Sequence, residues 1–135
     1  MSKLNIDEVM ALQMMGLSTK QILRTNPEAF DRLYSEHPEL EEYIDKANNI
    51  LDRQESMGIV SISCQDDDFP SRLLAIGEDC PAVVHCKGNL DLLNCEKAVA
   101  IIGARAADKE GNGKAYQFGK EYAENGYVVV SGLAL

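Results

Sequence analysis

The chain has 135 residues, of which 45% are hydrophobic, and a net charge of −9 at pH 7. This length is sufficient for one hydrophobic core or two small ones, and no apolar run approaches the roughly 18 residues that a membrane helix needs. Acidic residues near the N-terminus stand where a signal peptide would be apolar, so nothing predicts export and we expect a cytoplasmic protein.

Residues 1–57 predict a small domain of four short amphipathic helices. Apolar residues recur there at helical spacing. Gly16 is expected to end the first helix, Ser18 to cap the second, and Asn26-Pro27 to start the third. The longest helix is expected after Pro38. In the first helix we expect one apolar stripe, whose methionines are more typical of a core than of a partner-binding surface. The stripe consists of Ile6, Val9, Met10 and Met14.

The pattern changes at Gly58, and short strands are predicted at 59–63 and 81–86. Three adjacent acids, Asp66 to Asp68, lie between them. Consecutive side chains diverge and the other ligands of a calcium loop do not follow, so we expect a solvated turn there. The four cysteines lack the paired spacing of a zinc site, which predicts reduced thiols. We expect neither a metal nor a cofactor.

Residues 98–135 predict a strand, a helix and a second strand of a parallel sheet. An apolar run at 98–102 ends at Gly103, helical spacing follows at 111–125, and a second apolar run covers 127–130. Because neither run has a polar face, we expect both strands to be buried on both faces. The fold class is therefore α/β. We expect a small N-terminal helical domain, followed over residues 58–135 by an incomplete Rossmann-like domain with a parallel βαβ unit.

The helix of this unit should carry its apolar stripe on Ala115, Phe118 and Tyr122. Gly126 follows its last turn, where a residue in the left-handed conformation is expected.

Both strands of such a unit end at the same edge of the sheet, where open α/β sheets bind ligands. We expect Gly103-Ala104-Arg105 and Ser131-Gly132 to lie side by side there. Glycine lets the backbone approach a ligand, helix amides favour an anion, and arginine and serine side chains can hydrogen-bond phosphate oxygens. No GxGxxG or Walker motif follows the strand. The residues indicate a phosphate site, although a simple glycine turn and a surface ion pair of Arg105 explain the spacing equally well.

Five sequence pieces, in order and at matching intervals, resemble the DNA-processing protein A family, also called DprA or Smf. The resemblance covers about Ile59 to Leu135. The pieces are FPSRLLAI at Phe69 to Ile76, Pro81, KGN at Lys87 to Asn89, IGAR at Ile102 to Arg105, and SGLA at Ser131 to Ala134.

This resemblance implies a non-enzymatic recombination mediator of natural transformation, or competence. Such a protein binds single-stranded DNA without sequence preference and loads the RecA recombinase on it. The resemblance further implies a homodimer in the full-length protein and no membrane partner. Gly103, Ala104 and Arg105, with Ser131 and Gly132, would contact DNA phosphates. A net charge of −9 is unfavourable for this role, but residues 97–135 carry five bases and four acids and are nearly neutral.

Two departures from the family pattern weaken the proposed phosphate site. Ala104 replaces the family's serine, and Asp108 replaces a threonine, which places a carboxylate near the anion. Either phosphate binding is weaker here, or Asp108 turns toward solvent.

The family also continues beyond Ser-Gly-Leu-Ala, so we expect this chain to be a fragment that leaves an apolar sheet edge exposed, which favours self-association.

The alternative function is a nucleotide-binding or nucleotide-processing protein of the related lysine-decarboxylase-like Rossmann superfamily. Its Pro-Gly-Gly-x-Gly-Thr segment is not present, but that segment would fall after Leu135. The pieces FPSRLLAI and KGNLDLL favour the DNA-processing family.

Overall fold

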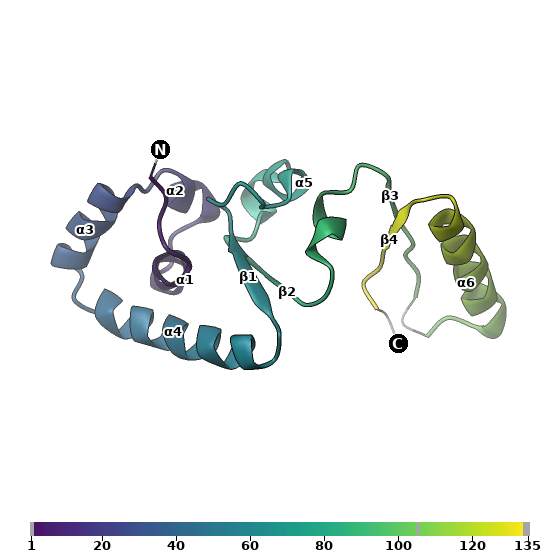
Figure 1. The fold of residues 1–135 in the computed structure, drawn as a ribbon, viewed down its shortest axis with the longest axis horizontal. Helices are drawn as coiled ribbons and strands as arrows, with labels where there is room; N and C mark the ends of the chain where they lie inside the picture. Colours follow the sequence, from purple (N-terminus) through teal and green to yellow (C-terminus); the bar gives the residue numbers. More distant parts are fainter. Residues whose placement is uncertain (1, 105, 134–135) are drawn as a thin grey trace. The chain divides into compact units, whose positions relative to one another are not determined.

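A computed structural model describes residues 2–104 and 106–133. It confirms the mixed α/β class, with helices first and short strands after them (Figure 1). Contacts divide the chain into a first compact unit up to Leu90 and a second from Asp91, which are described separately. The expected domain boundary after residue 57 stays a prediction. Within the described residues, no helix is long and apolar enough to cross a bilayer.

The first compact unit begins with four helices that start and end near the expected residues. Gly16 follows α1 with a φ of 104°, a left-handed value that favours glycine. The Ser18 Oγ accepts a hydrogen bond from the Gln21 amide, and the Asn26 Oδ1 accepts one from the Ala29 amide. The sequence therefore predicted these caps correctly. The helices are α1 (Ile6–Met15), α2 (Thr19–Leu23), α3 (Pro27–Glu36) and α4 (Leu40–Ser56).

The burial of α1 differs from the single apolar stripe expected from its sequence. Four consecutive residues, Val9 to Leu12, are buried, whereas Ile6 and Met14 are only half-buried. The reason is that α1 packs against α2, α4 and β1, so neighbours surround it on several sides (Figure 1). This helix is the centre of the first unit's core.

An antiparallel strand pair, β1 (Val60–Ser63) and β2 (Val83–Cys86), completes the first unit. The segment between the two strands contains α5 (Ser71–Leu74) and the 3-10 turn η1 (Gly77–Asp79). The strands are antiparallel, with Ser61 opposite His85 and Ser63 opposite Val83. The Ser61 Oγ lies 2.7 Å from His85 Nδ1 and 2.7 Å from Gln54 Oε1. The strand pair is thus linked to α4 by a side-chain hydrogen bond between Ser61 and Gln54.

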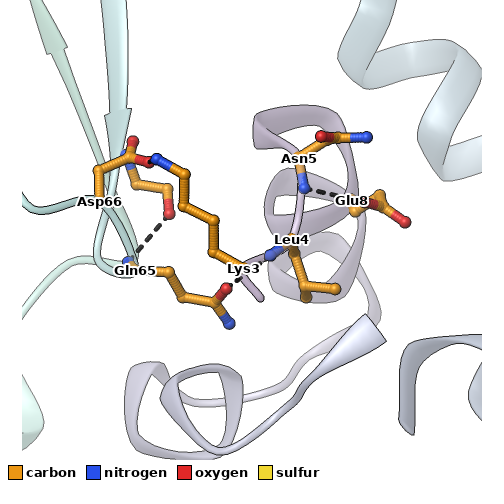
Figure 2. A network of polar contacts seen from close by, with 7 residues as sticks. Lys3, Leu4, Asn5, Glu8, Gln65 and Asp66 are labelled. Atoms are coloured by element: carbon orange, nitrogen blue, oxygen red, sulfur yellow. Dashed lines mark hydrogen bonds and ion pairs between the residues drawn. The ribbon is translucent and has the colours of Figure 1, made fainter. Parts of the chain in front are cut away.

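The loop after β1 fastens the N-terminal residues to this strand pair (Figure 2). The Gln65 Oε1 accepts a hydrogen bond from the Leu4 amide at 2.8 Å, and its Nε2 donates to the carbonyls of Ile22 and Thr25. Lys3 Nζ lies 2.6 Å from Asp66 Oδ1, and this hydrogen bond raises the pKa of Lys3. Asp66 also accepts a hydrogen bond from the Ser63 amide, so the first of the three acids has a structural role in the turn.

The buried thiol of Cys64 gives the first unit a predictable dependence on pH. Burial, together with nearby Cys80, raises the pKa of Cys64 to about 11 from its ordinary 9.0. The unfolded thiol therefore loses its proton first, and the free energy of unfolding should fall between about pH 9 and about pH 11. We expect urea denaturation across this range to show a shallower fall for Cys64→Ala, whose side chain does not titrate. If the free energy of unfolding fell equally steeply with pH in the two proteins, this assignment would be contradicted.

The second compact unit contains the predicted parallel pair. It comprises all but the first residue of the 3-10 turn η2 (Leu90–Asn94), together with β3 (Ala98–Ala100), α6 (Lys109–Glu124) and β4 (Val128–Val130). β3 and β4 are parallel, with Ala98 opposite Val128 and Ala100 opposite Val130. Gly126 follows α6 with a φ of 82°, as expected for a left-handed cap.

The expected burial of β3 and β4 is not observed. Ile102, in the predicted strand but beyond the end of β3, is 90% exposed, and Val130 of β4 is 53% exposed, because two strands and one helix cannot cover both faces of a sheet. The expected stripe of α6 is also exposed at Ala115, Phe118 and Tyr122. The helix approaches the sheet at Gly119 instead, where an added Cβ would lie 3.7 Å from the Ile101 side chain. The expectation of exposed apolar surface in this unit is therefore correct.

Candidate functional site

The parallel pairing of β3 and β4 brings the predicted site residues to one edge of the sheet. The Ile101 amide donates a hydrogen bond to the Val130 carbonyl at 3.0 Å, so the ladder continues to the ends of both strands. Gly103 and Ala104 follow β3 there, and Ser131 and Gly132 follow β4. We call these four residues the carboxyl edge. Arg105, the fifth predicted site residue, lies outside the described residues.

A hollow of about 420 Å³ opens at the carboxyl edge, within the second compact unit. Gly103, Ala104 and Ser131 line it, so the structure brings these predicted residues together. Gly132 is not among the lining residues. The remaining wall comes from the two residues that follow β3, from one residue of the loop before α6, and from one face of α6. These residues are Ile101, Ile102, Ala107, Gly111, Asn112, Lys114, Ala115 and Phe118.

The α6 side of the hollow was only partly evident from the sequence. Asn112 and Lys114 were not among the predicted site residues, although they lie in the first turns of a helix that begins beside the site. Lys114 forms an exposed ion pair with Glu110, with the Lys114 Nζ 3.4 Å from the Glu110 Oε1. A lysine already paired in this way adds little net positive charge, which agrees with the near-neutral composition of the segment.

Asp108 is the N-cap of α6, and its exposed carboxylate is held by the first turn of the helix. Its Oδ1 accepts a hydrogen bond from the Gly111 amide at 2.7 Å. This bond stabilises the start of the helix, and the negative charge interacts favourably with the helix dipole. A Cβ on residue 111 would lie only 3.1 Å from that oxygen, which favours glycine here. The Gly111 amide is therefore already occupied and is not available to an anion.

The hydroxyl of Ser131 supports the turn after β4. Its Oγ accepts a hydrogen bond from the Leu133 amide at 3.2 Å, and Leu133 has a left-handed φ of 54°. A hydroxyl that accepts such a bond retains its own proton as a donor. Ser131 therefore holds the carboxyl edge in shape and can still donate to a phosphate oxygen.

The titratable side chains outside the carboxyl edge were also compared with the requirements of a metal site and of a reactive thiol. Among residues 2–104 and 106–133, no three histidine, cysteine or acidic side chains are grouped to hold a metal ion. Cys64 and Cys80 are buried, and burial raises the pKa of both thiols, so the reactive thiolate is disfavoured.

Comparisons with known proteins identify the family. Residues 60–135 match the family described as DNA recombination-mediator protein A. The DNA processing protein DprA of Bacillus subtilis (strain 168) is 32% identical over 96 residues, which cover 71% of this chain and 32% of that protein. DprA of Streptococcus pneumoniae (strain ATCC BAA-255 / R6) is 45% identical over 74 residues, which cover 55% of this chain and 25% of that protein.

The aligned residues thus span about a third or less of the length of these relatives. No solved structure matches the chain significantly. The family match extends over more than half of the chain and includes β1, β2 and the whole carboxyl edge. The chain therefore belongs to the DNA recombination-mediator protein A family.

Proposed function

We propose that this chain binds single-stranded DNA without sequence preference and forms part of a non-enzymatic recombination mediator. In the whole protein this activity would serve natural transformation by loading RecA on incoming DNA in the cytoplasm, with a homodimer as the working form. The chain would contribute the carboxyl edge, where Gly103, Ala104, Ser131 and Gly132 meet the phosphate backbone together with Arg105.

The observation that carries this proposal is the parallel pairing of β3 and β4 inside the family-matched segment. It brings Gly103 and Ser131, which are 28 positions apart in the chain, around one hollow at the carboxyl edge, and open α/β sheets in general bind ligands at such an edge. Gly103 has open space where a Cβ would stand, so a backbone phosphate can approach its main chain. Phosphate contacts of this kind are independent of sequence.

Fluorescence anisotropy tests the proposal. The chain is titrated against labelled oligo-dT and, in parallel, against labelled ATP and AMP, at two salt concentrations. We expect oligo-dT binding that weakens as salt increases, because phosphate contacts release counterions, and no binding of either nucleotide. Nucleotide binding without DNA binding would overturn the proposal in favour of nucleotide processing. Absence of all binding would show that this chain does not hold a sufficient DNA site.

Replacing Arg105 with alanine should weaken oligonucleotide binding to a similar degree for all base sequences. The guanidinium is expected to contact phosphate, so the slope of log affinity against log salt should decrease by about one contact. Anisotropy titrations with oligo-dT and with mixed-sequence oligonucleotides measure both effects.

The matched control is Arg32→Ala, which removes an exposed arginine from α3 in the other compact unit. This variant should bind as the unchanged chain does. An Arg105→Ala variant with unchanged affinity and salt slope would exclude Arg105 from the site.

A further inference from the structure

Asp108 lies at the rim of the hollow, between two of the residues that line it. Ala107 and Gly111 both line the hollow, and the Asp108 Oδ1 accepts a hydrogen bond from the Gly111 amide at 2.7 Å. The Asp108 side chain is not part of the wall, but this bond holds its exposed carboxylate at the first turn of α6. The rim therefore carries a negative charge beside the hollow.

A second carboxylate neutralises the one charged side chain among the described residues that line the hollow. That side chain is Lys114, whose Nζ lies 3.4 Å from the Glu110 Oε1 one turn earlier in α6. Two groups of the α6 wall that could attract a phosphate are the Gly111 amide and the Lys114 ammonium. The chain's own carboxylates thus occupy both of these groups.

We infer that Asp108 and Glu110 compete with DNA phosphates for the α6 side of the hollow and thereby lower the affinity of this site. The inference rests on the proposed function and concerns how strongly the site binds. Two unit charges about 4 Å apart in water change an equilibrium constant about fivefold. A carboxylate fixed beside a phosphate should weaken binding by about this factor, and added salt should reduce the loss.

The test compares Asp108→Asn with the unchanged chain in anisotropy titrations of labelled oligo-dT. Asparagine is as good an N-cap as aspartate and keeps an acceptor for the Gly111 amide, so the change removes the charge and retains the cap. We expect Asp108→Asn to bind about fivefold more tightly at about 0.1 M salt, with a smaller difference at about 0.5 M salt because ions screen the repulsion. Equal or weaker binding by Asp108→Asn would overturn the inference.

Glu110→Gln tests the second carboxylate and leaves the cap unchanged. The substitution frees Lys114, so the affinity for oligo-dT should increase and the slope of log affinity against log salt should steepen by about one contact. Adding Lys114→Ala to this variant should remove the increase. An increase that persists without Lys114 would contradict the role given to Glu110.

The matched control is Glu124→Gln, which removes an exposed carboxylate from the last turn of the same helix. Positions 108 and 124 are about 24 Å apart along the helix axis, more than the Debye length of about 10 Å at 0.1 M salt, so this variant should bind as the unchanged chain does. An equal gain in Glu124→Gln would overturn the inference in favour of an effect of overall charge. If neither the unchanged chain nor Asp108→Asn binds oligo-dT, the proposed function fails; if the unchanged chain binds and Asp108→Asn binds no more tightly, only this inference fails.

Discussion

Replacing Leu12 with alanine should lower the free energy of unfolding of the first compact unit by about 3 kcal/mol. Leu12 is 0% exposed and lies in the middle of α1, which contacts α2, α4 and β1. The shorter side chain leaves a cavity that these elements can close only in part. Urea denaturation followed by far-UV circular dichroism should show a lower midpoint with an unchanged slope, because the surface exposed on unfolding stays the same.

The matched control is the same chemical change at Leu23 of α2, which is 38% exposed. Water already contacts part of this side chain, so Leu23→Ala should lower the free energy of unfolding clearly less than Leu12→Ala does. Similar losses for the two variants would show that α1 is not the centre of the core.

Replacing Gln65 with alanine should destabilise the first compact unit by about 2 kcal/mol, because three hydrogen bonds are lost together. The side chain accepts from the Leu4 amide at 2.8 Å and donates to the carbonyls of Ile22 at 2.8 Å and Thr25 at 3.0 Å. Ile22 and Thr25 are buried residues, so water cannot readily replace the donors that their carbonyls lose. Denaturation midpoints measure the loss.

Gln65→Glu distinguishes the hydrogen bond that the side chain accepts from the two that it donates. The carboxylate keeps the acceptor for Leu4 but loses both donors and faces the two carbonyls, so it should be at least as destabilising as alanine. Lys3→Ala, by contrast, should leave the midpoint nearly unchanged, since an exposed ion pair such as Lys3–Asp66 contributes little. A large shift of the denaturation midpoint in Lys3→Ala, with none in Gln65→Ala, would contradict this assignment.

The sequence predicted local structure well where neighbouring residues determine it. Ser18 and Asn26 cap their helices, and Gly16 and Gly126 adopt left-handed conformations after α1 and α6. Each of these features depends on a side chain and a backbone group a few positions apart. The parallel pairing of β3 with β4 was also predictable, because two apolar runs separated by one helix have few other arrangements.

Features that depend on distant residues were not predictable in the same way. Nothing near Gln65 indicates that its partners are Leu4, Ile22 and Thr25, at least 40 positions earlier. The burial of α1 likewise depends on which elements surround it.

At the candidate site, the sequence identified the residues that follow each strand but not the side chains that α6 adds. The cap at Asp108 was missed because the helix was expected to begin at Gly111 and begins at Lys109. An aspartate directly before a helical segment is a recognisable N-cap signal. Phe118 was expected in the apolar stripe of α6, but that it lines the same hollow as Ser131 follows only from the packing of that helix on the sheet.

The bond between Leu4 and Gln65 also sets an order of events during synthesis. The two residues are 61 positions apart, and the same Gln65 side chain holds the end of α2 through Ile22. A ribosome that adds about 5 to 20 residues per second needs roughly 3 to 12 seconds to proceed from one to the other. The four N-terminal helices are therefore all synthesised before the residue that fastens Leu4 to the end of α2, and this part of their packing is completed only after the first strand has been made.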